Sequence, residues 1–193
     1  MFREEKKVEG RMALEIEERY AEYSPPFDVT KIIEGLVAPV PEKYLRGLRK
    51  VLLVDTSSLS RRDRIGRTWS RKRKYDKSRI LGRYHYNNGA PWIEIRVDRT
   101  IEQWKGRSSK WLWIPAVRYF CIGEVFYHEL GHHIHRVARP EFREREDVAD
   151  NWGTKLSVNF VRKRYWYLLP VLLSASWVLR HLKWRKRSAL RRR

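Results

Sequence analysis

The sequence predicts an α+β fold in which a small sheet packs against several helices. Three observations lead to this class. Residues 51–54 form a short apolar run that ends in polar turn residues, as a buried strand does. Residues 80–97 hold two strand-like runs around an Asn-Asn-Gly sequence, which favours a β-hairpin. Apolar residues recur at helical spacing over 115–137, so we expect a long amphipathic helix there.

Local signals predict the elements of the amino-terminal part. Apolar residues spaced among many charges over 3–23 favour a first helix, which Pro25 and Pro26 would end. Asp28 is a typical N-cap, so a second helix is expected to begin directly after it. Pro41 is expected to start one further short helical turn.

Farther along the chain, two loops and two helical segments are expected. Residues 60–79 are polar and basic without apolar periodicity, and we interpret them as a loop. Residues 101–104 suit a helical turn, and 105–113 suit another loop. Pro140 is expected to end the long helix, and a final helix is predicted over about 144–162.

The second strand of the predicted hairpin alternates in character. Glu94 and Arg96 are expected on a face that meets water, and the intervening Ile93 and Ile95 on a buried face. We also expect the strand around 93–97 to pair with an extended substrate by β-addition.

Composition limits the class of protein. The chain has 193 residues, of which 42% are hydrophobic, so it can bury a core and global disorder is excluded. The single cysteine, Cys121, excludes an internal disulfide and a metal site built from cysteines. The amino terminus lacks the apolar stretch of a secretion signal, so a cytoplasmic location is expected. One Gln and four Asn among many charges are typical of heat-adapted proteins.

The charge is strongly positive and unevenly distributed. Lys and Arg number 43 against 23 acidic residues, a net charge of +20 that favours polyanionic partners. Residues 61–83 contain eleven bases and two acids, and no acidic residue follows Asp150. We therefore expect contact with nucleic acid through 61–83 and 180–193, unless these bases serve only to solvate the surface.

The most specific motif in the chain is His128-Glu129-Leu130-Gly131-His132, a complete H-E-x-x-H pattern. Positions i and i+4 lie on one face of a helix, so His128 and His132 can bind one metal ion. Glu129 then lies beside the ion and can take a proton from a zinc-bound water, as in zinc peptidases. Zn²⁺ is the expected cofactor. The alternative is a histidine-rich surface helix, because His133 and His135 follow the motif.

A zinc site of this type needs a third protein ligand. The position six residues after the motif is Ala138, which cannot bind metal, and His135 lies too far along the helix to share the ion with His128. Glu146 and Asp150 are spaced i and i+4 on the next predicted helix. Glu146 is the candidate third ligand, and Asp150 can accept the free ring N–H of a ligand histidine. Asp147 is the weaker alternative ligand. A further alternative is that these acidic residues form only an ordinary charged helix surface and bind no metal.

With the segment 146–153, Glu-Asp-Val-Ala-Asp-Asn-Trp-Gly, the chain resembles the small gluzincin-type metallopeptidases of the ImmA/IrrE group. These carry HExxH followed by E-x-x-A-[ND]-x-[FW]-A, and the resemblance covers about 28–160. It implies a minimal zincin fold, a small twisted sheet packed on the active-site helix with its last strand at the cleft edge. It also implies peptide-bond hydrolysis with Glu146 as third ligand. Gly153 stands where the group usually has Ala, and the basic 60–79 insertion departs from the pattern.

Three regions are expected: an amino-terminal helix over 1–27, a zincin-like domain over 28–163 and an aromatic, basic appendage over 164–193. Residues 165–179 carry no charge and are flanked by eleven bases, but they are too few to span a bilayer. The segment 165–193 is expected to pack on the domain, to attach to an anionic membrane surface or to bind nucleic acid.

The sequence therefore predicts a zinc metallopeptidase that cleaves an intracellular protein, with zinc held by His128, His132 and Glu146 and with Glu129 as general base. The alternative is a nucleic-acid-binding protein whose zinc site is structural or vestigial. A structural site would need a fourth protein ligand, and Cys121, two turns before His128, is better suited to the core. Neither the substrate, the oxyanion-stabilising residue nor the oligomeric state follows from the sequence.

Overall fold

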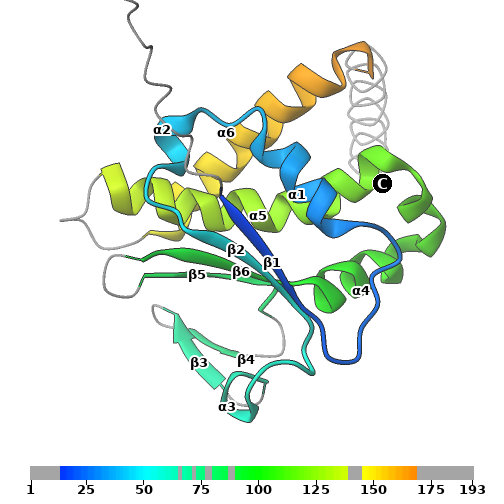
Figure 1. Cartoon of the computed structure of the whole chain (residues 1–193), viewed down its shortest axis with the longest axis vertical. Coiled ribbons are helices and arrows are strands. Elements are labelled where there is room, and N and C mark those ends of the chain that lie inside the picture. The colour runs from blue at the N-terminus through cyan, green and yellow to red at the C-terminus, as the bar shows by residue number, and fades with distance from the viewer. Residues whose placement is uncertain are drawn as a thin grey trace, which may run out of the picture.

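The computed structural model describes residues 14–64, 67–70, 73–76, 80–86, 90–138 and 145–168 (Figure 1). These residues form a mixed α+β fold with a four-stranded sheet, a separate two-stranded sheet and the helices α1 to α6. The expected fold class is therefore confirmed at this level.

No helix within the described part of the chain is long and apolar enough to cross a membrane.

The main sheet is mixed, with the strand order β1-β2-β6-β5. Its strands are β1 (Glu15–Arg19), β2 (Lys50–Val54), β5 (Gly82–His85) and β6 (Trp92–Arg96). β2 pairs in parallel with β1 and with β6, whereas β5 runs antiparallel to β6. The predicted strand over 51–54 and the predicted hairpin are thus confirmed, although the turn at 87–89 lies outside the described residues.

Most of the predicted helices are also present. The helices are α1 (Val29–Val37), α2 (Glu42–Leu45), α3 (Arg61–Arg64), α4 (Val97–Ser108), α5 (Pro115–Ala138) and α6 (Glu146–Arg164), with 3₁₀ turns η2 (Ser109–Trp113) and η3 (Trp166–Leu168). Asp28 caps α1 as expected, because its carboxylate accepts a hydrogen bond from the Lys31 amide at 2.8 Å. α5 and α6 begin and end within a few residues of their predicted limits.

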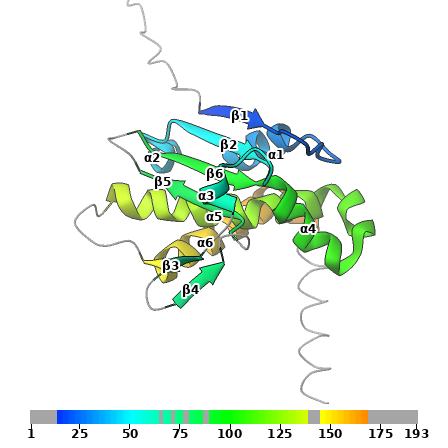
Figure 2. The same cartoon turned by 90° about the horizontal axis from the view of Figure 1, so that it is seen from below.

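The long helix α5 forms the centre of the molecule. It contacts β5 and β6 on one side and α6 on the other, so it lies between the sheet and α6 (Figures 1 and 2). The face of the sheet with Ile93 and Ile95 packs into one hydrophobic core with the apolar residues of α1 and α5. Burying this core on both sides fixes the position and rotation of α5, which carries the metal motif.

The predicted amino-terminal helix over 1–27 is wrong where the structure describes it, because residues 15–19 form the strand β1. Residues 1–13 lie outside the described residues. β1 adds to β2 in parallel register, with Ile16 opposite Val51. Backbone pairing with a buried strand outweighs the local helical pattern, since β structure depends strongly on tertiary context.

The predicted solvent face of the second hairpin strand is also wrong. Glu94 and Arg96 are only 9% and 1% exposed. β6 is an interior strand. Asp63 of α3 contacts Arg96 on this side, where a guanidinium N–H of Arg96 donates to the Asp63 carbonyl at 3.3 Å. His85 contacts the Glu94 carboxylate at 3.2 Å. Paired charges thus replace the expected water contact.

Two segments expected to be loops contain regular structure. Within 60–79 the chain forms α3 and an antiparallel pair, β3 (Arg67–Ser70) and β4 (Arg73–Asp76). Within 105–113 the helix α4 continues to Ser108 and η2 follows directly. Neither segment shows apolar periodicity, so the sequence pattern gave no signal for them.

Candidate metal centre

Two histidines of α5 form one half of the candidate site. His128 and His132 lie one helical turn apart on the side of α5 that meets α6, as i and i+4 spacing requires. Their Nε2 atoms are 3.2 Å apart and their ring centroids 4.9 Å apart. Both rings therefore direct the same nitrogen toward one point.

Glu146, the first residue of α6, supplies the third side of the site. Its Oε2 atom lies 3.5 Å from Nε2 of His128 and 3.6 Å from Nε2 of His132. The circle through three atoms with these separations has a radius of about 2.0 Å, close to zinc–ligand bond lengths of ~2.0–2.2 Å. His128, His132 and Glu146 therefore form a group that could hold one metal ion, and two imidazoles with a carboxylate are a donor set that zinc accepts.

Asp150 lies behind the first histidine, one turn along α6 from Glu146. Its Oδ1 atom is 2.9 Å from Nδ1 of His128. A carboxylate in this position accepts the Nδ1–H and leaves the Nε2 lone pair directed at the ion. Asp147, the weaker candidate, instead pairs with Arg145 at 2.7 Å and lies outside the group of possible ligands.

The three ligands converge because α5 and α6 approach each other closely. A Cβ atom added at Gly131 would lie 2.6 Å from the carbonyl oxygen of Ala149, so only glycine permits this contact. A Cβ atom at Gly153 would lie 3.4 Å from Cα of His128, an ordinary van der Waals distance. The glycine inside the motif therefore sets the distance at which Glu146 and Asp150 reach the histidines.

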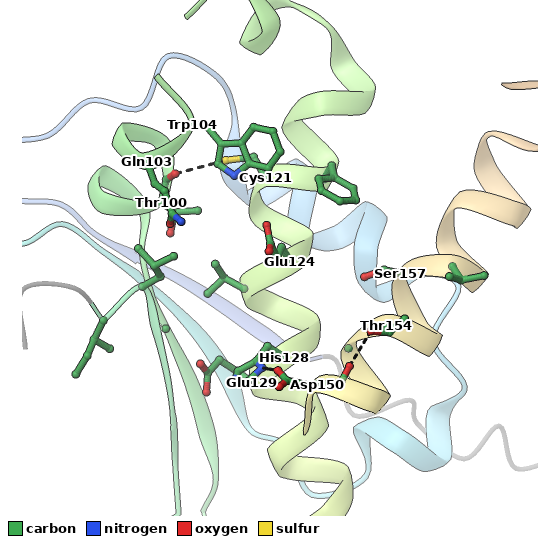
Figure 3. A pocket seen from close by; sticks show the side chains of 17 residues that line it. Thr100, Gln103, Trp104, Cys121, Glu124, His128, Glu129, Asp150, Thr154 and Ser157 are labelled. Atoms are coloured by element: carbon green, nitrogen blue, oxygen red, sulfur yellow. Dashed lines mark hydrogen bonds and ion pairs between the residues drawn. The ribbon is translucent and has the colours of Figure 1, made fainter. Parts of the chain in front are cut away.

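Glu129 follows the first ligand but points away from α6, toward the sheet. Its side chain is 7% exposed and lies against β5, where a Cβ atom at Gly82 would be 2.9 Å from Oε1 of Glu129. Figure 3 shows Glu129 and His128 next to each other at one end of a cleft. Glu129 therefore borders the cleft next to His128.

The cleft beside Glu129 has a volume of about 660 Å³. Its walls come from α4, α5, α6 and the residues around the start of β5, and they include Trp104, Phe120 and Val125. The charged side chains among the 17 described residues that line it are Glu124, Glu129 and Asp150, all acidic. In a chain with 43 bases among 193 residues, about four Lys or Arg would be expected in such a sample. The cleft is thus an acidic, partly apolar region on a basic protein.

The histidines that follow the motif do not join the site. His133 points to the opposite side, where its Nε2 lies 3.1 Å from the Arg46 carbonyl and its Nδ1 3.2 Å from the Tyr84 hydroxyl. Burial lowers the pKa of His133, although the contact with the Arg46 carbonyl raises it in part, so the ring is neutral. His135 is buried and lies outside the group of possible ligands. The alternative of a histidine-rich surface helix is therefore wrong for this segment.

Some parts of the site have no local signal in the sequence. Gly82 and Trp104 reach the cleft through strand pairing and helix packing. The expected substrate strand around 93–97 is wrong, because β6 is hydrogen-bonded between β2 and β5. β5 is the edge strand beside the site.

Comparisons with protein-family models, curated proteins and solved structures found no match to this chain. Inferences about the chemistry of the site therefore depend on its residues and geometry.

Proposed function

We propose that this protein is a zinc-dependent metallopeptidase with a minimal zincin fold. The observation that carries the proposal is the convergence of His128, His132 and Glu146 on a point about 2.0 Å from each ligand atom. An HExxH helix packed under a small mixed sheet, followed by a helix with the third ligand, supports the fold assignment.

The residues around this point have separate roles in hydrolysis. Glu129 accepts a proton from the attacking water and returns it to the leaving amine, because it lies beside the ligands and borders the cleft. Asp150 holds His128 in the tautomer and orientation that present Nε2. Zinc, when bound, lowers the pKa of water toward ~7 and polarises the scissile carbonyl.

The substrate in this proposal is an extended segment of a protein. β5 is an edge strand that contacts α5, so a peptide that pairs with it passes close to Glu129. The cleft offers apolar walls and the carboxylate of Glu124, one helical turn before His128. Segments with large apolar or basic side chains suit this combination.

A structural zinc site in a nucleic-acid-binding protein is the less favoured alternative. Such a site closes its fourth position with a protein ligand. Among the described residues, the group that could hold a metal has three members. Cys121 is fully buried in the core, and burial raises the pKa of its thiol to about 12. A group of three candidate ligands, of which His128 lines a cleft next to Glu129, favours a catalytic site.

Metal analysis combined with a cleavage assay tests the proposal. Protein purified without added metal should contain about one zinc per chain and cleave some members of a peptide library rich in apolar and basic residues. Glu129→Gln should keep the zinc and the fold and lose ~10²–10⁴-fold in kcat/KM. Full activity in this variant would refute the mechanism. Zinc binding without cleavage by the wild type would favour the structural alternative.

A further inference from the structure

Large hydrophobic side chains are exposed mainly at one end of the molecule. Among the described residues, nine large hydrophobic side chains are exposed, and seven of them lie in the two segments 111–120 and 158–167. They are Trp111, Trp113, Ile114, Phe120, Val158, Trp166 and Tyr167. Trp113 is 79% exposed and Trp166 68%. We refer to these seven residues as the aromatic face.

Contacts between helices bring the two segments together. Arg118 of α5 donates to the Leu112 and Trp113 carbonyls at 2.6 and 3.4 Å, which ties η2 to the start of α5. The end of α6 packs on the same part of α5, where Tyr119 and Tyr165 have ring centroids 6.5 Å apart. Figures 1 and 2 show the start of α5, η2 and the end of α6 at one end of the molecule.

An apolar groove lies between these elements. Its volume is about 310 Å³, and its lining includes Val117, Phe120, Val161 and Tyr165. Aromatic side chains around an apolar groove are suited to the boundary between lipid headgroups and acyl chains, where Trp and Tyr concentrate.

Basic residues surround the aromatic face. Lys110 is exposed at its η2 side, and Arg162, Lys163 and Arg164 are exposed at its α6 side. The sequence then continues from η3 into the uncharged residues up to 179, followed by eight bases between 180 and 193. Apolar anchors bordered by cations match the chemistry of an anionic bilayer surface.

We propose that the aromatic face docks the protein on an anionic lipid bilayer. Nucleic acid offers phosphates and base faces but no apolar layer that would bury Ile114, Val158 and the groove. A second copy of the chain would bring a net charge of +20 and the same exposed bases against this face, which opposes self-association. Lipid satisfies both the apolar and the basic requirement.

Docking in this way leaves the metal centre away from the bilayer. Trp113 and His128 are separated by fifteen residues, almost all within α5, or ~22 Å at 1.5 Å per residue. The end of the cleft at His128 and Glu129 therefore lies away from Trp113, although Phe120 and Val158 of the aromatic face line the other part of the cleft. The other aromatic residues of the face, Trp111, Trp113, Trp166 and Tyr167, do not line the cleft. Variants of these four residues therefore test docking without changing the candidate metal site or the cleft.

Vesicle co-sedimentation of the full chain tests the inference. At ~0.1 M salt, the wild type should bind phosphatidylcholine vesicles that contain ~30% phosphatidylserine and bind pure phosphatidylcholine much less. Trp111→Ser/Trp113→Ser should lower the partition coefficient ~10-fold or more, because two exposed indoles no longer enter the interface. Trp166→Ser/Tyr167→Ser provides an independent second variant. Tyr86→Ser/Val137→Ser, which changes the two exposed hydrophobic residues outside the aromatic face, is the matched control and should bind normally.

Several results would overturn the inference. The inference would be refuted if the wild type did not bind anionic vesicles. It would also be refuted if both aromatic-face variants kept their circular dichroism spectrum and bound the vesicles as the wild type does. Duplex DNA binding that depends on Trp111 and Trp113, without vesicle binding, would assign the face to nucleic acid. A dimer that dissociates in the same variant would assign it to a second copy.

Discussion

Glu146 and Asp147 are adjacent acidic residues, but only Glu146 lies beside the two histidines. Substitutions at the two positions therefore serve as a variant and its matched control. Glu146→Ala should lower zinc affinity strongly, because it removes one of three ligand atoms. Asp147→Ala should retain zinc, because its carboxylate pairs with Arg145 instead. Titration with a competing chromophoric chelator measures both affinities. Zinc loss in Asp147→Ala with full retention in Glu146→Ala would show that the third ligand is wrongly assigned.

In the proposed site Asp150 contacts His128 and is not itself a ligand, so its removal should weaken zinc binding less than removal of Glu146. Asp150→Ala should weaken zinc binding by ~10–100-fold, the usual effect of losing a carboxylate that orients a ligand histidine. Asp150→Asn should recover part of this loss, since the amide oxygen still accepts the Nδ1–H. Equal affinities for wild type and Asp150→Ala would contradict this role.

At the scale of residues, the candidate metal site was largely predictable. His128 and His132 are recognisable because helical spacing alone places them on one face. Glu146 was predicted only by combining the motif with the E-x-x-A-D spacing, and the structure confirms that it lies beside both histidines. The cleft residues were not predictable, because Gly82 and Trp104 come from elements distant in sequence and carry no motif of their own.

At the scale of elements, the α5–α6 contact controls the site, and the two glycines within it should differ. Gly131→Ala should destabilise the fold by ~1–3 kcal/mol and weaken zinc binding, because the new methyl group meets the Ala149 backbone at 2.6 Å. Gly153→Ala should be neutral or stabilise by up to ~1 kcal/mol, since its methyl group has room and alanine favours helix. Urea denaturation and zinc titration of both variants measure these effects. If Gly131→Ala changed neither the stability nor the zinc affinity, α5 and α6 could move apart with little loss of free energy, and the prediction would be wrong.

Element predictions failed where partners distant in sequence decide the outcome. The apolar residues of 3–23 are spaced as in a helix, yet residues 15–19 form a strand because β2 offers a parallel partner. Glu94 and Arg96 alternate with apolar residues, yet both are buried, Arg96 against the Asp63 carbonyl of α3 and Glu94 against His85 of β5. Local pattern cannot distinguish an edge strand from an interior strand, because this depends on which element arrives next to it.

At the scale of the whole molecule, Asp55 ties the amino-terminal segment to the sheet. It follows β2, is almost fully buried, and accepts hydrogen bonds from the amides of Ala21, Glu22 and Tyr23. Burial raises the pKa of Asp55, but bonds from Ser57, the Glu22 amide and Ser58 lower it more, so the net pKa is well below the ordinary value. The hydrogen bonds of the folded protein therefore stabilise the carboxylate form of Asp55.

This depressed pKa predicts a stability loss in acid. The contribution is complete above the unfolded pKa of ~3.9 and is lost as pH falls through the folded-state pKa. Asp55→Ala should cost ~2–4 kcal/mol at pH 7, since it leaves buried amides without an acceptor. It should also flatten the decline in stability below pH ~4. Urea midpoints across pH measure both effects. Asp28→Asn, a change at an exposed cap, is the control and should change little; a flat wild-type profile would contradict the prediction.

The two edges of the main sheet are unlike. The outer strand β1 carries Glu15, Glu17, Glu18 and Arg19 within five residues, and charges on an outer strand oppose pairing with strands of other molecules. β5, at the other edge, carries one basic residue, Arg83, and His85. The charges of β1 therefore oppose aggregation at one edge, whereas β5, beside the candidate metal centre, has no comparable run of charges. Replacing the three glutamates of β1 with glutamine would remove this protection, with self-association as the consequence.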